Sequence, residues 1–356
     1  MIKYKENASL LPHNTFGFDV KASMLVEYNH EDDLPHIFSD ERVAGRKFLH
    51  IGQGSNLLFV NDFDGVVLHS RIKGIKIASQ SDDMVLIECG AGEVWDDLCQ
   101  WCVQHGFYGL ENLSGIPGEV GAAAVQNIGA YGAEFGDLAV AVAVYDVVNN
   151  RHAIISAADC QYGYRMSIFK TDEFRNRFVV TSVLLRVSRN GELNLEYGNI
   201  KAALLERGYS LTAHLSKRAS RMPGVKSITL SGLREVILAI RQSKLPDPAV
   251  FGNAGSFFKN PVISSAKYKQ LSATWPDMPK YDVDADFVKV PAAWLIERSG
   301  CKGRRIGDAA VYDKQCLVLV NRGKARPEEV VKLSDAIIRT VSDRFGITIE
   351  PEVNII

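Results

Sequence analysis

Residues 114–132 read SGIPGEVGAAAVQNIGAYG, and they lie within a longer stretch, 109–136, that holds seven glycines in 28 residues. Glycine has no Cβ, so its backbone can approach a ligand closely, and it loses more conformational entropy on folding than other residues. A segment with so little side-chain bulk suits main chain that lies against a large flat or anionic ligand. A Gly/Ala-rich packing segment is the alternative.

A second glycine-rich segment, GQGSN at 52–56, follows the short apolar run 48–51. Small residues after a strand let backbone N–H groups reach phosphate oxygens. A Rossmann fingerprint would need a third glycine and a following helix, but position 57 is Leu and residues 57–60 resemble another strand. A plain tight turn remains possible. Two such segments in one half of the chain suggest a dinucleotide with two phosphates.

The composition is that of an ordinary globular protein: 356 residues, 46% hydrophobic and 23% charged, with a net charge of −1. This predicts two or three domains, excludes intrinsic disorder and gives no basic excess for nucleic acid. The first residues are charged, which predicts no signal peptide, and the longest apolar run, 138–145, is shorter than the ~20 residues of a membrane span. We therefore expect a soluble, cytoplasmic protein.

Apolar spacing predicts an α+β fold, because strands and helices are mixed without regular βαβ alternation. Short strands are expected throughout 1–90, with soft domain boundaries near 70 and 225. The clearest elements are the strands 138–148, 178–187 and 347–353 and the helices 93–105, 199–207, 233–240 and 327–345. Cys99 and Cys102 form a C-x-x-C motif on the first of these helices, where we expect them to be core residues. No spacing predicts a metal site.

Four further patterns could carry chemistry. Arg241 and Lys244 share one helix face at i and i+3, as a phosphate clamp or as exposed surface charge. The segment 252–261, GNAGSFFKNP, would need Gly at 258 to form a nucleophile elbow, and Phe stands there, so Ser256 suits proton donation better than attack. The segment 164–170, YRMSIFK, mixes cations with aromatic residues, or is an exposed strand edge. By pattern alone Glu352 is an exposed acid near the end of the chain.

Together these segments resemble the UDP-N-acetylenolpyruvoylglucosamine reductase (MurB) family, and the resemblance runs over nearly the whole chain. The segment 195–199 contains Tyr197, which is similar to the characteristic tyrosine of type I members. The segments that carry the resemblance are HNTF at 13–16, GQGSNLL at 52–58, SGIPGEVGAAAVQNIGAYG at 114–132, YRMSIFK at 164–170, KLPDP at 244–248, GNAGSFFKNP at 252–261, AAWLIERSGCKG at 292–303 and EPEV at 350–353.

The resemblance implies an FAD-binding domain of the vanillyl-alcohol-oxidase/PCMH type plus a smaller α/β substrate domain. Residues 1–70 and 71–225 would form the FAD-binding region, the latter with the type I tyrosine segment. Residues 226–345 would bind substrate, and 346–356 would be a C-terminal strand carrying the catalytic Glu.

The resemblance also implies three sets of site residues. The catalytic residues would be Ser256 as proton donor and the pair Arg165 and Glu352, which stabilises the reaction intermediate. FAD would be bound by Gly52, Gly54, Ser55, Asn56, Ser114, Gly115, Pro117, Gly118, Gly121, Ala122, Asn127 and Gly129. Substrate would be bound by Tyr131, Tyr197, Arg241, Lys244, Asn260, Lys289 and Gln315. Position 354 is Asn where type I members often carry Arg, which puts part of the substrate contact in doubt.

The implied activity is NADPH-dependent reduction of an enolpyruvyl UDP-sugar through non-covalently bound FAD, in the synthesis of peptidoglycan precursors and hence in cell-wall growth, cell shape and cell division. The expected partners are the UDP-sugar and NADPH, with no nucleic acid and no membrane, and the expected state is a monomer. Two other readings stay open. An oxidase of the same flavin fold would use O₂ as acceptor, and a flavin-binding regulatory module would have no turnover.

Overall fold

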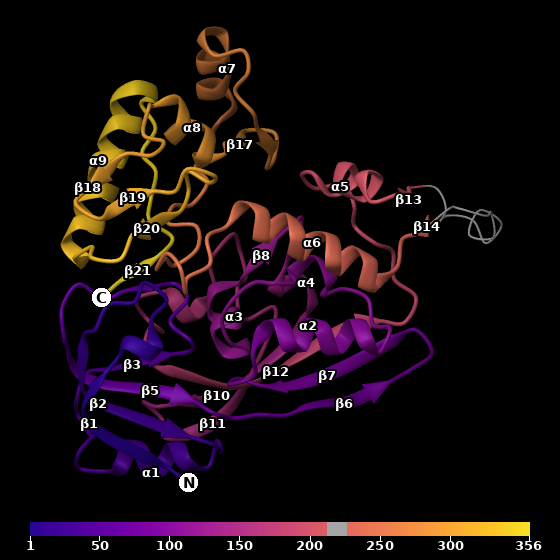
Figure 1. The fold of residues 1–356 in the computed structure, drawn as a ribbon. Coiled ribbons are helices and arrows are strands. Elements are labelled where there is room, and N and C mark those ends of the chain that lie inside the picture. Colours follow the sequence, from indigo (N-terminus) through magenta and orange to yellow (C-terminus); the bar gives the residue numbers. More distant parts are fainter. Residues whose placement is uncertain (212–225) are drawn as a thin grey trace. The chain divides into compact units, whose positions relative to one another are not determined.

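The computed structural model describes residues 1–211 and 226–356, and within them the chain forms two compact units built from separated segments (Figure 1). Unit 1 comprises Met1–Ala8, Ala22–Gln53 and Asp64–Ser243, and unit 2 comprises Ser9–Lys21, Gly54–Phe63 and Lys244–Ile356. The chain therefore leaves and re-enters each unit within its first quarter. The boundary predicted near 225 lies outside the described residues, and the functional division at 70 and 345 stays a prediction.

Unit 1 is centred on a five-stranded antiparallel sheet of order β11-β10-β12-β7-β6. Its strands are β6 (Ile75–Gln80), β7 (Met84–Gly90), β10 (Ala139–Asp146), β11 (Arg151–Ser156) and β12 (Phe178–Ser188). Two helices, α2 (Trp95–Gln104) and α3 (Val120–Gln126), lie along one side of this sheet in Figure 1. Alternate residues of the strands point toward them and form the largest described core cluster.

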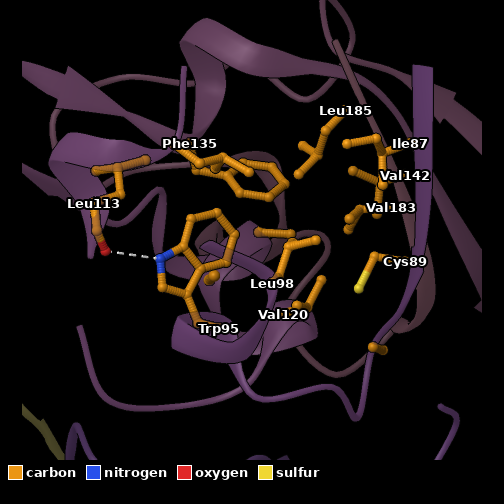
Figure 2. Packing of buried hydrophobic residues seen from close by; sticks show 14 of the residues in the cluster. Ile87, Cys89, Trp95, Leu98, Leu113, Val120, Phe135, Val142, Val183 and Leu185 are labelled. Carbon is orange, nitrogen blue, oxygen red and sulfur yellow. Dashed lines mark hydrogen bonds between the residues drawn. The ribbon is translucent and has the colours of Figure 1, made fainter. Parts of the chain in front are cut away.

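Trp95, the first residue of α2, lies in the middle of this core (Figure 2). Its ring contacts that of Phe135 at a centroid distance of 5.9 Å, and its indole N–H donates to the carbonyl oxygen of Leu113 at 3.0 Å. Cys99 and Cys102 are fully buried on the same helix, which confirms their prediction as core residues. The loop that ends at Leu113 is thus tied to the start of α2.

A second sheet of order β1-β2-β5-β3 positions the first glycine-rich segment. Its strands are β1 (Lys3–Ser9), β2 (Lys21–Tyr28), β3 (Phe48–Ile51) and β5 (Phe63–Ser70), and α1 (Asp33–Ser39) packs with them. Strand β3 runs parallel to β5, so Ile51 lies opposite His69. The chain leaves this sheet directly into Gly52.

The C-terminal part of unit 1 packs around α6 (Leu230–Lys244), whose buried face includes Leu233, Val236 and Ile237. This cluster also takes in α5 (Ile200–Glu206), and β13 (Tyr209–Ser210) pairs with β14 (Lys226–Ser227). The helix α6 extends beyond the predicted range 233–240 at both ends, so Arg241 and Lys244 both lie on it.

Unit 2 is a mixed α/β unit with three short sheets, of order β15-β17-β16, β18-β19-β20 and β21-β4. Their strands are β4 (Leu57–Leu58), β15 (Val262–Ser264), β16 (Tyr281–Asp282), β17 (Phe287–Lys289), β18 (Arg305–Ile306), β19 (Ala309–Val311), β20 (Leu319–Asn321) and β21 (Asn354–Ile355). Its helices are α7 (Ser265–Thr274), α8 (Ala292–Arg298) and α9 (Pro327–Phe345). The helix α9 begins at Pro327 and ends before Gly346, whose φ of +60° suits glycine at a helix C-terminus.

The strand predicted at 347–353 is wrong. The last strand is β21, which pairs in parallel with β4, while residues 347–350 are irregular. Pro351 has no N–H to donate, and the N–H of Glu352 donates instead to the carbonyl oxygen of Phe257 at 2.7 Å. The other strongly patterned helices and strands of the prediction are confirmed within one to three residues at most ends. None of the helices in the described ranges is long and apolar enough to cross a membrane.

Candidate active site

The first glycine-rich segment requires glycine at two positions for different reasons. A Cβ on Gly52 would lie 3.0 Å from the Oε2 atom of Glu119 and 3.5 Å from the Cβ of Ala122. Gly54 has a φ of +70°, and a Cβ there would overlap the carbonyl oxygen of His13. Side chains at either site would displace packed neighbours or strain the backbone.

Beneath Gly52 lies a buried polar pair that sequence reasoning missed. The Nε2 atom of His69 lies 3.1 Å from Oε1 of Glu119, and both side chains are under 5% exposed. Glu27 lies on the other side of the ring, with Oε1 3.6 Å from Nδ1. Since Glu119 directly precedes α3, the pair ties strand β5 to the start of this helix.

A neighbouring histidine, His50, forms a hydrogen bond with the hydroxyl of Tyr28 at 2.9 Å. Burial, followed by the charge of His69, lowers the pKa of His50 to about 4.

The second glycine-rich segment contains residues 114–118, here called the SGIPG loop, and it is held by the first turn of α2. The backbone N–H of Trp95 donates to the carbonyl oxygen of Gly118 at 3.0 Å. The carboxylate of Asp96 accepts the N–H of Gly115 at 2.6 Å. The indole of Trp95 also donates to Leu113. Trp95 and Asp96, two consecutive residues of α2, therefore hold the loop at Gly115 and Gly118 and its flank at Leu113.

Asn127 connects the end of α3 to the turn that carries Arg165. It occupies the left-handed region with a φ of +47°, and its side-chain amide donates to Glu134 and to the carbonyl oxygen of Gly163, both at 2.8 Å. Its side-chain oxygen accepts the N–H of Gly136 at 2.8 Å. These bonds are all internal to the protein, so they give Asn127 a positioning role. Its predicted contact with FAD stays a prediction.

Arg165 lies against β8 (Gly129–Ala130), and its Nη2 atom donates to the carbonyl oxygen of Gly129 at 2.8 Å. Its φ of +56° is rare for a residue with a side chain and indicates local strain, which structures commonly store at functional sites. Lys170 closes this turn, because its ammonium group donates to the carbonyl oxygen of Arg165 at 2.9 Å and to Gln126 at 2.7 Å. The arginine is thus held in a fixed, strained turn.

Arg241 on α6 interacts with Tyr131, and Tyr197 lies beside the turn that follows Tyr131. The Nε atom of Arg241 donates to the carbonyl oxygen of Gly115 at 3.0 Å. Tyr131 interacts with Arg241, and burial raises the pKa of the Tyr131 hydroxyl. A Cβ on Gly132 would lie 3.5 Å from the Cβ of Tyr197, so the type I tyrosine lies beside the Tyr131 turn. Lys244 is the last residue of α6, one turn beyond Arg241.

In unit 2, Ser256 and Glu352 lie on neighbouring backbone segments. Residues 255–258, here called the GSFF segment, form isolated bridges from Ser256 to Val318 and from Phe258 to Pro351. Because Glu352 N donates to the carbonyl oxygen of the intervening Phe257, the two predicted catalytic residues of this unit are fixed by one backbone network. Asn56 also reaches this network, since its side-chain amide donates to the carbonyl oxygen of Glu352 at 3.3 Å.

The remaining predicted substrate residues of unit 2 border the same region of chain. The side-chain oxygen of Asn260 accepts the N–H of Ala292 at 2.9 Å, at the start of α8. Lys289 ends strand β17, and Gln315 accepts the N–H of Leu317 at 3.3 Å, just before the residue that bridges Ser256. Each of these side chains therefore has a defined place, and their contacts with substrate stay predictions.

Comparisons with known proteins agree along the whole chain. A family model described as UDP-N-acetylenolpyruvoylglucosamine reductase, C-terminal domain, matches residues 247–356, and an FAD binding domain model matches residues 22–156. The UDP-N-acetylenolpyruvoylglucosamine reductase of Bacteroides fragilis is 48% identical over 99% of this chain and 100% of its own length. That of Flavobacterium johnsoniae is 40% identical over the full length of both chains. The chain belongs to the UDP-N-acetylenolpyruvoylglucosamine reductase family.

The fold agrees with this family. The crystal structure of the Thermus caldophilus family member matches all of this chain and 98% of its own with a TM-score of 0.64, at 21% sequence identity. The α+β class and the FAD-binding domain expected from the sequence are thereby confirmed.

The residues of this reductase-family chain fit FAD. The hydroxyl of Ser114 is fully buried and has no hydrogen-bond partner among the described residues, so its hydrogen-bonding capacity is unused within the protein. Ala122 is exposed on α3 beside Gly52, which leaves a patch of backbone almost free of side chains. Close approach of backbone to phosphate needs such a patch.

Sequence reasoning missed the charged residues that position these loops: Asp96, Arg234, His69 and Glu119. The guanidinium of Arg234 binds both carboxylate oxygens of Asp96, at 2.6 and 2.8 Å. The partners are 138 positions apart, and each looks like an ordinary charged residue on a helix. The only available signal was Asp96 itself, an acid in the first turn of a helix that precedes a glycine-rich loop.

Proposed function

We propose that this protein reduces the enolpyruvyl group of UDP-N-acetylglucosamine-enolpyruvate to give UDP-N-acetylmuramate, with NADPH as the reductant and FAD as the bound cofactor. The observation that carries the proposal is the 48% identity with a reductase of that name over essentially the full length of both chains. The reaction supplies a precursor of peptidoglycan. We further propose that the enzyme is a monomer and that it acts in the cytoplasm, where UDP-sugars and NADPH are found.

Bound FAD would supply the hydride-transfer chemistry between NADPH and the substrate, and the protein would supply binding, orientation and electrostatics. The residues proposed to hold it are those of the 52–56 segment and of the SGIPG loop, continued through Gly121, Ala122 and Gly129. Gly121 packs closely, since a Cβ there would lie 2.9 Å from the Cβ of Ala91. This packing fixes the start of α3 against the sheet.

Ser256 is proposed to give its hydroxyl proton to the substrate carbon next to the ether oxygen, after hydride has reached the terminal carbon. A hydroxyl is a weak acid, but a carbon with carbanion character is a strong enough base to take its proton. Accurate placement is therefore the main requirement. The bridge to Val318 and the tight turn at Gly255, with a φ of +70°, support that placement.

Arg165 and Glu352 are proposed to stabilise the negative charge that develops on the substrate and spreads into its carboxylate. A fixed cation aimed at developing charge is worth about 2.7–4 kcal/mol in comparable sites. The bond to Gly129 and the left-handed turn at Arg165 fix the position of its guanidinium, which supports such a role. Glu352 beside a substrate carboxylate would repel it, so we propose that Glu352 is protonated or paired with a cation when substrate is bound.

The UDP-sugar is proposed to be held by Arg241 and Lys244 at its diphosphate, with Tyr131, Tyr197, Asn260, Lys289 and Gln315 as further contacts. Asn354, which stands where type I members often carry Arg, bonds instead to the backbone: its side-chain amide donates to the carbonyl oxygen of Asn56 at 3.3 Å. This supports a structural role for Asn354 in placing the 52–56 segment.

Stopped-flow kinetics of the two half-reactions test the proposal. Ser256→Ala should leave reduction of FAD by NADPH unchanged and slow transfer to the enolpyruvyl sugar by about 10²–10⁴-fold. Ser272→Ala, on the surface helix α7, is the matched control and should change neither step. Equal slowing of both steps would make Ser256 structural. Rapid aerobic NADPH oxidation without substrate would favour an oxidase, and flavin binding without turnover would favour a regulatory module.

A further inference from the structure

Both backbone polar groups of Gly115 form hydrogen bonds with side chains of unit 1. Its N–H donates to Oδ1 of Asp96 on α2, at 2.6 Å, and its carbonyl oxygen accepts the Nε–H of Arg241 on α6, at 3.0 Å. Gly115 has a φ of +73°, and a Cβ there would lie 2.8 Å from Cδ2 of Leu238 and 3.2 Å from Arg241. The SGIPG loop therefore lies directly on α6.

Three residues of α6 face this loop at helical spacing: Arg234, Leu238 and Arg241, at i, i+4 and i+7. The first arginine binds Asp96, while the last binds Gly115. One face of a single helix thus carries two arginines with different partners, one a carboxylate and one a carbonyl oxygen.

The charges on this face are unequally satisfied. Arg234 makes a two-point ion pair with Asp96 and is 8% exposed. Burial pushes the pKa of the Asp96 carboxyl up, but the bonds from Arg234 and Gly115 outweigh it, and the pKa lies below its usual value. Within the described residues no carboxylate lies at ion-pair distance from Arg241, and burial lowers the pKa of its guanidinium. Asp96 is nonetheless close enough to attract it.

A carboxylate this close to Arg241 competes with an anionic substrate for the guanidinium group. Left alone, Asp96 would draw the Arg241 guanidinium toward itself, because two opposite charges at short range in a partly buried site attract strongly. With Arg234 bound to both oxygens, Asp96 can still accept the Gly115 N–H but has little remaining attraction for a second arginine. Arg241 then keeps its contacts with the Gly115 carbonyl oxygen and with Tyr131.

We propose that Arg234 and Asp96 are positioning residues for Arg241: Asp96 fixes the Gly115 peptide, and Arg234 neutralises Asp96 so that it does not capture the arginine that binds the nucleoside diphosphate. This inference rests on the proposed function, which gives Arg241 an anionic ligand. It assigns a task to two residues that are not among those proposed to bind substrate or cofactor.

The test compares the single variant Arg234→Met with the double variant that also carries Asp96→Asn. UDP is the probe, and the FAD-loaded enzyme is used throughout. Arg234→Met leaves Asp96 free to pair with Arg241, so the Kd for UDP, measured calorimetrically, should rise about tenfold, the loss typical of one hydrogen bond to a charged group. Adding Asp96→Asn removes the capturing charge and keeps an oxygen for Gly115. The double variant should return to within about threefold of the original protein.

Asp97→Asn is the matched control, because Asp97 is the next residue of α2, is exposed and carries the same charge. Combined with Arg234→Met it should give no recovery. In turnover assays Arg234→Met should raise the KM for the UDP-sugar about tenfold and leave kcat within about threefold, since the arginine acts on binding alone. If Arg234→Met does not fold, Arg234→Gln replaces it with the same expectations.

A merely structural ion pair gives a different pattern. Loss of stability with an unchanged Kd for UDP, or a double variant that binds UDP no better than Arg234→Met, would overturn this inference while turnover by the original protein still supports the proposed function. If the original protein neither binds UDP nor turns over the enolpyruvyl sugar, the proposed function fails, and this inference with it.

Discussion

The SGIPG loop and the GSFF segment are both short, glycine-containing stretches, but they are fixed by different forces. The SGIPG loop is held mainly by side chains at Gly115, where Asp96 accepts the N–H and Arg241 donates to the carbonyl oxygen, beside one backbone bond from Trp95 to Gly118. The GSFF segment is held by backbone bridges and by two fully buried phenylalanines. Charge and hydrogen bonding should therefore control the first stretch, and core packing the second.

Truncation of the GSFF core should give the largest effect. Phe257 is fully buried and contacts the rings of Phe16 and Phe258 at centroid distances of 6.5 and 5.2 Å. Phe257→Ala should lower the free energy of unfolding by about 3–5 kcal/mol, as measured by denaturant titration. Val250→Ala, at a side chain that is 68% exposed, should stay within about 0.5 kcal/mol. A loss under about 1 kcal/mol for Phe257→Ala would show that backbone pairing alone holds the segment.

Alanine substitutions at Gly255 and Gly115, which both have left-handed backbone, distinguish the cost of steric crowding from the cost of backbone strain. Gly255 and Gly115 have φ values of +70° and +73°, so an alanine at either costs about 1–2 kcal/mol in strain. A Cβ on Gly255 meets nothing within 4 Å, whereas one on Gly115 meets Leu238 and Arg241. Gly115→Ala should therefore destabilise the protein by about 1 kcal/mol more than Gly255→Ala, and only Gly115→Ala should weaken UDP binding.

Equal losses of stability and equal UDP affinity in the two alanine variants would contradict the comparison. Such a result would mean that Leu238 moves aside without cost and that Arg241 does not depend on the Gly115 carbonyl. Thermal unfolding of both variants with and without UDP distinguishes these cases. UDP raises the melting temperature of a variant only if it binds the folded form of that variant.

The elements with strong local signals could be predicted from the sequence. The helix α9 has an apolar stripe, Pro at its first position and Gly after its last, and its ends at Pro327 and Phe345 agree with the prediction. β21 could not be placed, because its position depends on pairing with Leu57, almost 300 residues earlier. Local pattern carries no information about such a partner.

The candidate site divides in the same way. The residues with characteristic neighbours, such as Ser256 in GSFF and Gly115 in SGIPG, could be singled out by motif. The residues that hold them, such as Asp96 and Arg234, could not, because their roles arise from a contact across 138 positions. Glycine and serine motifs mark where a ligand is expected, and the charges that fix their geometry appear only once the chain is folded.

The smallest expected effect is the pH dependence of the stability that Asp96 contributes. Because the pKa of Asp96 lies below its usual value in the folded protein, its stabilising contribution is fully present above the unfolded pKa of about 4 and is lost as the pH falls through the lower folded pKa. The loss in stability caused by Asp96→Asn should therefore be larger at pH 6 than at pH 3, as measured by urea titration at both. The loss caused by Phe257→Ala should be the same at both, since the backbone and ring contacts of the GSFF segment do not titrate. A pH-independent effect of Asp96→Asn would mean that the carboxylate charge does not help to hold the SGIPG loop, and the contrast between the two stretches would then reduce to packing alone.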